Sequence, residues 1–391
     1  MTAWIHRIDT LLPDFSFAQE EAMVKMQEWA RDDRDRRLVR AVYRHSGIER
    51  RHSVLRNYDG EGEGAFLRRD AGGALRGPGT AARNDIFSTE SRAMSVALAR
   101  KVIGNCPGVA PSDVTHVVTV SCTGFYNPGP DYYIVRELGM SDATQRYHLG
   151  FMGCYAAFPA LRMAAQFCAA DPSAVILVMC LELCSLHLQL NGSEDNLLAN
   201  SLFADGAGAA IVSAREPDPG SPAYRLDGFR SALVPAGEQD MAWRIGDQGF
   251  DIALSSYVPK LIGSNIRELV GPALADGGLS LSDVATWAVH PGGKAIIDQV
   301  QRTLGLSDDQ VSASRAVLRR CGNMSSATIL FVLEEILKRP AGKGRERVCA
   351  VAFGPGLTVE TATLEALFAP DAAGVEAAAA IPLPAGRVVS P

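Results

Sequence analysis

Residues 111–124, PSDVTHVVTVSCTG, have a counterpart in residues 281–293, LSDVATWAVHPGG. Each stretch has Ser-Asp-Val after its first residue, continues as a run of apolar, largely β-branched residues, and ends in a reactive side chain followed two residues later by glycine. Such a run predicts a buried strand that leads into a loop. A pattern that occurs twice in one chain predicts a duplicated fold.

The spacing after the two strands is also repeated. Cys122 precedes Cys154 by 32 residues, and His290 precedes Asn323 by 33. In each copy a stretch of helical pattern comes first, then a turn with glycine and a polar residue, then a helix of small and apolar residues. A pseudo-twofold relation between the copies would bring Cys122 and Cys154 toward His290 and Asn323.

The segments that follow suggest a layered α/β architecture. Residues 154–167 and 323–337 are largely apolar on every face, which predicts helices buried between layers. Residues 174–182 and 347–356 are apolar runs that predict strands covered on both faces. We therefore expect a duplicated α/β fold, arranged as a five-layer α/β/α/β/α sandwich.

The chain of 391 residues is long enough for two such halves. We expect an N-terminal half over 1–220 that carries Cys154 and a C-terminal half over 221–370 that carries His290 and Asn323. Several prolines in 214–233 indicate the connection between them, and 15–43 predicts an N-terminal helix. The small, proline-punctuated residues 371–391 predict a disordered tail.

Composition excludes several classes of function. Charged residues make up 21% and hydrophobic ones 47%, and the net charge of −6 argues against nucleic-acid binding. The longest apolar run, 175–184, is too short to span a membrane, and the N-terminus does not resemble a secretion signal. Eight cysteines with neither disulfide nor zinc spacing predict reduced thiols in the cytoplasm and no metal site.

Cys154 is the first candidate for chemistry. It lies in GFMGCYAAFPALRMA, residues 150–164, where glycines lead into a small-residue helix. Backbone N–H groups and the helix dipole at that position favour the thiolate, which attacks thioester carbon. The alternative is a buried thiol that packs as a small hydrophobe.

His290 and Asn323 would complete a site around Cys154. An imidazolium at His290 would stabilise the thiolate, and the Asn323 amide with His290 could hold the oxyanion of a decarboxylating malonyl thioester. Such a set suits Claisen condensation without metal or prosthetic group. Taken singly, His290 could be a structural hydrogen-bonding residue and Asn323 a helix N-cap.

From about residue 46 to 368 the chain resembles the type III polyketide synthases, the chalcone synthase-like branch of the thiolase superfamily. The motifs that carry the resemblance are GCYAAFPALR (153–162), LFADGAGA (202–209), HPGGKAI (290–296), GNMSSATILFVLEE (322–335) and AFGPGLTVE (352–360). The resemblance implies a thiolase-like fold and an acyltransferase that uses acyl-CoA and malonyl-CoA.

The resemblance also implies roles for particular residues. Cys154 would be the acyl-carrying nucleophile, with His290 and Asn323 as the decarboxylation and oxyanion pair. Phe203, otherwise a core aromatic, would be the gatekeeper between the CoA tunnel and the reaction cavity. The loop with Gly354 and Pro355 would shape the cavity floor.

Further candidates would line the cavity and bind substrate. Cys122, Cys184 and His187 stand where plant chalcone synthases have threonine, which disfavours a flavonoid-type starter. Ser325 is a substrate-binding candidate beside Asn323. Gly249 matches a family glycine that sets cavity volume, or is simply a turn glycine.

The family also implies partners. It forms homodimers in which a partner residue helps to wall the active site, and the matching segment is 122–131, with Asn127 where plant enzymes have Met. Arg50 and Arg51 are candidates for CoA phosphates, because guanidinium groups suit that geometry. With His52 they could instead be a solvated basic surface.

We therefore predict a polyketide synthase that extends an acyl-CoA starter with malonyl-CoA and cyclises the chain to a resorcinol or pyrone. The sequence is closest in appearance to bacterial alkylresorcinol and alkylpyrone synthases, which take long acyl-CoA starters. One alternative is a ketoacyl carrier protein synthase III-like enzyme that performs a single condensation. Others are a 3,5-dihydroxyphenylacetyl-CoA synthase-like enzyme that uses malonyl-CoA only and a catalytically silent binding homologue.

Overall fold

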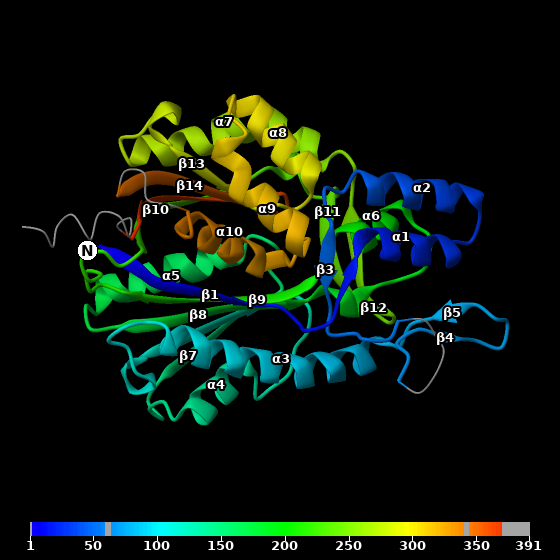
Figure 1. Ribbon diagram of the computed structural model, residues 1–391, viewed down its shortest axis with the longest axis horizontal. Coiled ribbons are helices and arrows are strands. Elements are labelled where there is room, and N and C mark those ends of the chain that lie inside the picture. The colour runs from blue at the N-terminus through cyan, green and yellow to red at the C-terminus, as the bar shows by residue number, and fades with distance from the viewer. Residues whose placement is uncertain (1, 59–63, 340–343, 370–391) are drawn as a thin grey trace, which may run out of the picture.

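The computed structural model describes residues 2–58, 64–339 and 344–369. Five layers of secondary structure are stacked on one another (Figure 1), as the sequence predicts. Helices form both outer layers and the middle layer, and strands form the two layers between them.

The strands of the first half follow one another in the order β1 (Ala3–Leu11), β9 (Asp205–Ser213), β8 (Val175–Leu183), β6 (His116–Ser121) and β7 (Gln145–Gly150). β6 is parallel to β7 and β8, whereas β9 is antiparallel to both β8 and β1. β8 is the predicted strand of residues 174–182, displaced by one residue. It is buried along nearly its whole length, because helices cover both of its faces.

The second half repeats this pairing with β13 (Thr286–Val289), β14 (Arg345–Gly354), β15 (Thr358–Leu367) and β10 (Ala223–Leu233). β13 is parallel to β14, and the other pairs are antiparallel. The two stretches that contain Ser-Asp-Val lead into β6 and β13, so the duplication read from the sequence is confirmed.

The two strand layers are joined through β1. Ala3, Trp4 and Ile5 pair with β10 of the second half, whereas the strand from Ile5 to Leu11 pairs mainly with β9 of the first half. The layers therefore form one continuous nine-stranded sheet. The sequence pattern did not predict this connection, which holds the halves in a fixed relation.

The middle layer consists of α5 (Ala157–Ala170) and α10 (Thr328–Leu337). Their apolar side chains, together with those of both strand layers, make up the largest buried cluster. Both predicted helices are present, but each begins a few residues late. Cys154 and Asn323 consequently lie in the turns that precede α5 and α10.

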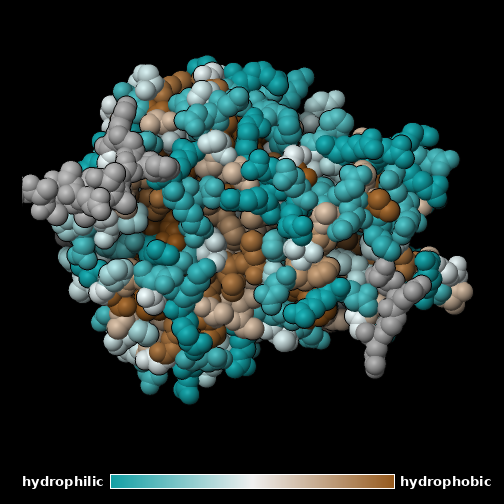
Figure 2. All heavy atoms as spheres, in the orientation of Figure 1, coloured by the Kyte–Doolittle hydropathy of each residue, from teal (hydrophilic) through white to brown (hydrophobic). Residues whose placement is uncertain are grey.

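The outer layers cover the remaining sheet faces. α3 (Thr80–Gly104) and α4 (Pro130–Leu138) pack on the first half, and α7 (Val258–Asp276), α8 (Lys294–Leu304) and α9 (Ser312–Cys321) lie on the second. Figure 2 shows hydrophilic residues over most of the visible face, with apolar ones gathered toward its middle. In the described ranges, no helix has the length and apolar character needed to cross a membrane.

Two predicted segments were wrong in part. Residues 15–43 are not one helix but β2 (Ser16–Ala18), α1 (Gln19–Glu28) and the start of α2 (Asp33–Arg44). The helices are separate because Asp32 takes an extended conformation and its side chain caps α2 by accepting from the Asp35 N–H. Of residues 214–233, only 214–222 form the connection, because β10 begins at Ala223 and extends to Leu233.

The remaining elements are short. They are β3 (Arg50–His52), β4 (Arg68–Arg69), β5 (Leu75–Arg76), α6 (Glu194–Leu202), β11 (Met241–Gly246) and β12 (Gly249–Leu254). β11 and β12 form a hairpin beside the cavity described next. The proposed boundary between residues 220 and 221 lies in the segment between β9 and β10, and residues 371–391 lie outside the described residues.

Candidate active site

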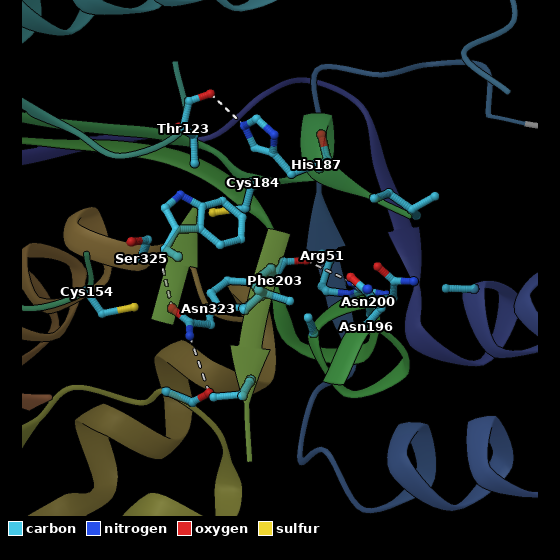
Figure 3. A pocket seen from close by; sticks show the side chains of 18 of the residues that line it. Arg51, Thr123, Cys154, Cys184, His187, Asn196, Asn200, Phe203, Asn323 and Ser325 are labelled. Carbon is cyan, nitrogen blue, oxygen red and sulfur yellow. Dashed lines mark hydrogen bonds between the residues drawn. The ribbon is translucent and has the colours of Figure 1, made fainter. Parts of the chain in front are cut away.

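One cavity contains Cys154, His290 and Asn323. Figure 3 shows Cys154 and Asn323 side by side on its wall. Cys154 comes from the first half of the chain, and His290 and Asn323 come from the second. Phe203, Cys122, Cys184, His187, Ser325 and Pro355 line the same cavity. The tertiary structure thus brings together most of the residues singled out from the sequence.

Cys154 lies in a tight turn between β7 and α5. Gly153 has a φ of 90°, and a Cβ atom added there would lie 2.6 Å from Cδ of Pro355. Gly354 is equally confined, because an added Cβ would meet the ring of Tyr155 at 2.4 Å. Glycine at both positions allows the loop of Pro355 to pack directly against the turn that holds the thiol.

Burial controls the protonation of Cys154. It raises the pKa of the thiol to about 11, against the lowering effect of hydrogen bonds to Ser325 and Asn323. The expectation that the start of a helix would favour the thiolate is therefore not met. Loss of hydration outweighs the contribution of the nearby helix.

His290 follows β13, and its backbone N–H donates to the carbonyl of Val351 at 2.8 Å. Its side chain is buried, yet neither ring nitrogen has a hydrogen-bond partner in the described part of the chain. Burial lowers its pKa to about 3, so the free imidazole is neutral. A buried polar group without such a partner is available to hydrogen-bond a bound ligand.

Asn323 is fixed by hydrogen bonds to its amide. Its Oδ1 accepts from the N–H of Ser325 at 2.9 Å, and its Nδ2 donates to the carbonyl of Gly292 at 3.3 Å (Figure 3). The first bond holds the turn before α10, but Asn323 is not the N-cap of that helix, because the N-cap position of α10 is Ala327. The same orientation leaves the amide on the cavity wall near Cys154.

Cys122 is a buried neighbour of the site. Its sulfur lies 3.3 Å from the hydroxyl of Ser325, and burial raises its pKa well above the usual value. Burial also raises the pKa of Cys184 strongly. Both residues therefore present neutral thiols to the cavity.

His187 has both ring nitrogens engaged. Its Nε2 lies 2.7 Å from the carbonyl of Thr123, and its Nδ1 accepts from the N–H of Phe250 at 3.1 Å. Its ring stacks on Phe250 with a centroid separation of 4.1 Å and meets the edge of Trp243 at 5.4 Å. Burial lowers its pKa to about 4, so His187 forms a neutral aromatic wall.

Phe203 follows the last residue of α6, and Arg51 lies behind it. Nη1 of Arg51 donates to the carbonyls of Phe203 and Asn200, each at 2.8 Å, and its Nε donates to Oε1 of Gln19 at 2.9 Å. Arg51 is buried, and its guanidinium also lies over the rings of Phe17 and Tyr43. These contacts hold the turn that carries Phe203.

Comparisons with known proteins agree with this geometry. The profiles for the N-terminal and C-terminal domains of chalcone and stilbene synthases match residues 71–217 and 227–368. The chain belongs to the chalcone and stilbene synthase family. It is 33% identical over 347 residues to the alpha-pyrone synthesis polyketide synthase-like Pks18 of Mycobacterium tuberculosis, covering 88% of this chain and 86% of that one. It is 34% identical to bisdemethoxycurcumin synthase of Oryza sativa subsp. japonica over 77% of this chain and 76% of that one.

Solved structures of type III polyketide synthases have the same fold. PKS-I of the brown alga Ectocarpus siliculosus superimposes with a TM-score of 0.85 at 30% identity, covering 93% of this chain and 98% of that one. 1,3,6,8-Tetrahydroxynaphthalene synthase of Streptomyces coelicolor A3(2) gives a TM-score of 0.81 at 26% identity, covering 93% and 99%. This type III polyketide synthase is therefore an acyltransferase with the thiolase fold.

The roles that the sequence predicts for Gly249, Arg50 and Arg51 stay predictions. Gly249 is not among the described residues that line the cavity, and its φ of 105° places it at the β11–β12 turn, where an added Cβ would meet Arg83 at 3.2 Å. Arg50 is exposed outside the cavity wall and donates to the Ser16 hydroxyl, whereas Arg51 lines the cavity and is engaged with backbone carbonyls.

Sequence reasoning missed three residues of this synthase. Trp243, on β11, lines the cavity and donates from Nε1 to the carbonyl of Cys122 at 2.8 Å. Glu182 is fully buried beneath the site. Tyr58 is a further residue that lines the cavity. Of these three, only Glu182 could have been noticed in the sequence. It lies in a strand predicted to be buried, and a buried carboxylate needs hydrogen-bond partners. Across the residues that the structure covers, no cluster of His, Cys, Asp and Glu is placed to hold a metal ion.

Proposed function

We propose that the enzyme loads an acyl group from acyl-CoA onto Cys154 and extends it by repeated decarboxylative condensation with malonyl-CoA. The observation that carries the proposal is the meeting of Cys154, His290 and Asn323 in one cavity, with an imidazole that has no hydrogen-bond partner among the described residues. These three side chains supply a nucleophile, a base and two hydrogen-bond donors. The chemistry needs no redox step.

Loading begins with proton transfer from the thiol of Cys154 to His290. The thiolate attacks the thioester carbon of acyl-CoA, and the oxyanion accepts hydrogen bonds from the imidazolium and from Nδ2 of Asn323. Collapse of the tetrahedral intermediate expels the CoA thiolate, which takes the proton from His290. The enzyme is left acylated with a neutral imidazole.

Extension uses the same donors. The carboxylate of malonyl-CoA leaves as CO₂, and its bonding electrons form an enolate whose oxygen accepts from His290 and Asn323. The enolate carbon attacks the acyl carbon on Cys154, and the Cys154 thiolate leaves. Transfer of the longer chain back to Cys154 allows another round.

We propose a long-chain acyl-CoA as starter and a pyrone or resorcinol as product. The cavity continues past Phe203 to α1, and its apolar lining there includes Phe17, Met26 and Trp29. An apolar wall of this kind suits an alkyl chain. The relative Pks18, which is named for alpha-pyrone synthesis, supports the same product class.

The experiment is incubation of the purified enzyme with malonyl-CoA and acyl-CoA starters of graded length, with products identified by mass. We expect pyrones or resorcinols that incorporate the starter, and more product from long starters than from acetyl-CoA. Product that forms only with malonyl carrier protein would favour single condensation in fatty-acid initiation. Product that forms equally well from malonyl-CoA alone would favour the starter-independent alternative.

For the CoA phosphates we propose contacts at the cavity mouth. Arg56 and His52 line the cavity, and the Arg56 side chain is largely exposed. Its nearest carboxylate, that of Asp14, is 4.0 Å away and also exposed, a weak ion pair that a phosphate could replace. Arg56→Ala should raise KM for acyl-CoA several-fold with little change in kcat.

We also propose a homodimer in the cytoplasm. The edge strand β7 and the exposed ring of Phe125, which lies 5.6 Å from Phe151, offer a face for a second copy. CoA substrates and eight free cysteines suit a reducing compartment. Light scattering should give a dimer at micromolar concentration and a monomer for Phe125→Asp, and a monomeric wild type would contradict the dimer.

A further inference from the structure

A chain of hydroxyl groups connects the cavity to a buried carboxylate. The hydroxyl of Tyr58 lies 2.7 Å from Oγ of Ser53, and Ser53 Oγ donates to Oγ of Ser185 at 2.9 Å. Ser185 Oγ donates in turn to Oδ2 of Asp205 at 2.5 Å. Four side chains from three separate parts of the chain thus form one continuous hydrogen-bonded path.

The two ends of this path differ in their surroundings. Tyr58 and Ser185 line the cavity, whereas Ser53 and Asp205 are buried behind them. The residue before Ser185 is Cys184, which faces the cavity and whose pKa is raised mainly by burial and further by the charges of Glu182, Cys122, Asp205 and Cys154. The path therefore ends at the wall of the cavity that holds the proposed nucleophile.

Asp205 is suited to receive a proton. Its carboxylate accepts from the backbone N–H groups of Ser185 and Val54, each at 2.8 Å, as well as from the Ser185 hydroxyl. Burial raises its pKa to about 6 against these hydrogen bonds, so it is ionised at neutral pH but is a stronger base than an ordinary aspartate. Burial raises the pKa of Tyr58 well above its usual value, so Tyr58 keeps its proton.

The directions of the hydrogen bonds follow from an ionised Asp205. Ser185 must donate to the carboxylate and Ser53 to Ser185, so the one proton of Tyr58 points to Ser53. The phenol oxygen of Tyr58 then has a lone pair free toward the cavity. A ligand hydroxyl placed there would act as the donor.

We propose that Tyr58, Ser53, Ser185 and Asp205 form a proton relay that deprotonates the enol of the extended poly-β-keto chain during ring closure. The inference rests on the proposed function, because the chain exists only if Cys154 is acylated and extended. Tyr58 is the residue that touches the substrate. Ser53, Ser185 and Asp205 act through it.

The step balances without any other reactant. The enol O–H gives its proton to the oxygen of Tyr58, whose own proton passes to Ser53, then from Ser53 to Ser185 and from Ser185 to Asp205. The enol oxygen forms a C–O bond to the thioester carbon on Cys154, and the C–S bond breaks with its electron pair on sulfur. A lactone, a Cys154 thiolate and a protonated Asp205 remain, and the proton is later lost to solvent.

The test separates ring closure from the earlier steps by following the mass of the intact enzyme after mixing with decanoyl-CoA and malonyl-CoA. In Tyr58→Phe and Ser185→Ala, loading and extension should run within about twofold of wild type. Release of the extended chain should be at least tenfold slower, so the enzyme should accumulate the mass of an extended acyl group. The double variant should be no slower than either single one, because both break the same path.

Two controls address a merely structural effect. Ser185→Thr keeps the hydroxyl and should restore release, and Tyr132→Phe removes a phenol on α4, away from the cavity, and should behave as wild type. Normal release by Tyr58→Phe would overturn the relay, as would equal slowing of loading, extension and release. A wild-type enzyme that never acquires the starter mass would instead contradict the proposed function, and the relay with it.

Discussion

Phe203, in the first half of the chain, and Asn323, in the second, form a β-bridge between their backbones. The N–H of Asn323 donates to the carbonyl of Leu202, and the N–H of Ala204 donates to the carbonyl of Asn323, each at 2.9 Å. The Phe203 side chain on the cavity wall and the amide beside Cys154 are therefore placed by one backbone bridge. Arg51 supports that bridge through the carbonyl of Phe203.

Replacement of Arg51 tests whether it is structural or binds phosphate. Arg51→Met removes the donors to the carbonyls of Phe203 and Asn200, and a buried acceptor left without a partner costs about 1–3 kcal/mol. We expect a lower free energy of unfolding in urea and a lower kcat. An increase in KM for acyl-CoA alone, with unchanged stability, would show that Arg51 binds phosphate. Arg50→Met is the matched control.

His290 should control the titration of Cys154. Burial disfavours both the Cys154 thiolate and the His290 imidazolium when each is charged alone. The two opposite charges in the same cavity would attract each other. The pH dependence of iodoacetamide alkylation should show the Cys154 thiol titrating near pH 11 in wild type and at higher pH in His290→Ala. The same midpoint in both proteins would mean that His290 is not the partner of the thiol.

Asp205 should make the stability of the enzyme depend on pH. Its pKa is raised from 3.8 to about 6 by burial, so the folded state holds the proton to higher pH than the unfolded state. Its favourable contribution is present below pH 4 and is lost as the pH rises to 6, a change of about 3 kcal/mol. The difference in unfolding free energy between wild type and Asp205→Asn should fall by that amount over this range. The exposed control Asp142→Asn should show no such trend.

Trp243 should limit the space available to the growing chain. Its indole lies against His187 and is held by the hydrogen bond to the carbonyl of Cys122. Trp243→Gly should enlarge the cavity there and shift the product distribution, measured by mass, toward chains with at least one more malonyl unit. Trp243→Phe keeps most of the wall and should retain the wild-type distribution. Identical products from all three proteins would show that Trp243 does not determine the chain length of the product.

Glu182 should be essential for stability. Its Oε2 accepts from the N–H of Cys122 and the hydroxyl of Thr123, each at 2.9 Å, and its Oε1 accepts from the hydroxyl of Ser326 at 2.5 Å. These bonds join the two halves beneath the cavity. Glu182→Leu should lower the unfolding free energy by about 3 kcal/mol or more, because several buried donors lose their acceptor. The exposed control Glu268→Gln should unfold as wild type does.

The sequence predicted the parts of the site that depend on local pattern. Cys154, His290 and Asn323 stand at equivalent places in a repeat, and the strands and helices of that repeat could be read from their apolar periodicity. The side chains of Trp243 and Tyr58 could not be placed in this way. Each comes from a peripheral segment whose position depends on packing against the core.

By itself the sequence determined the duplicated layers, the family and the three residues that meet in the cavity. Only the tertiary structure decided that Cys154 and His290 are neutral, that Arg51 is buried behind Phe203, and that Asp205 connects to Tyr58. The reason is physical. The pattern of buried and exposed positions in a helix or strand follows from residues that are neighbours in the sequence. The hydration and hydrogen-bond partners of a side chain depend instead on segments that are distant in the chain.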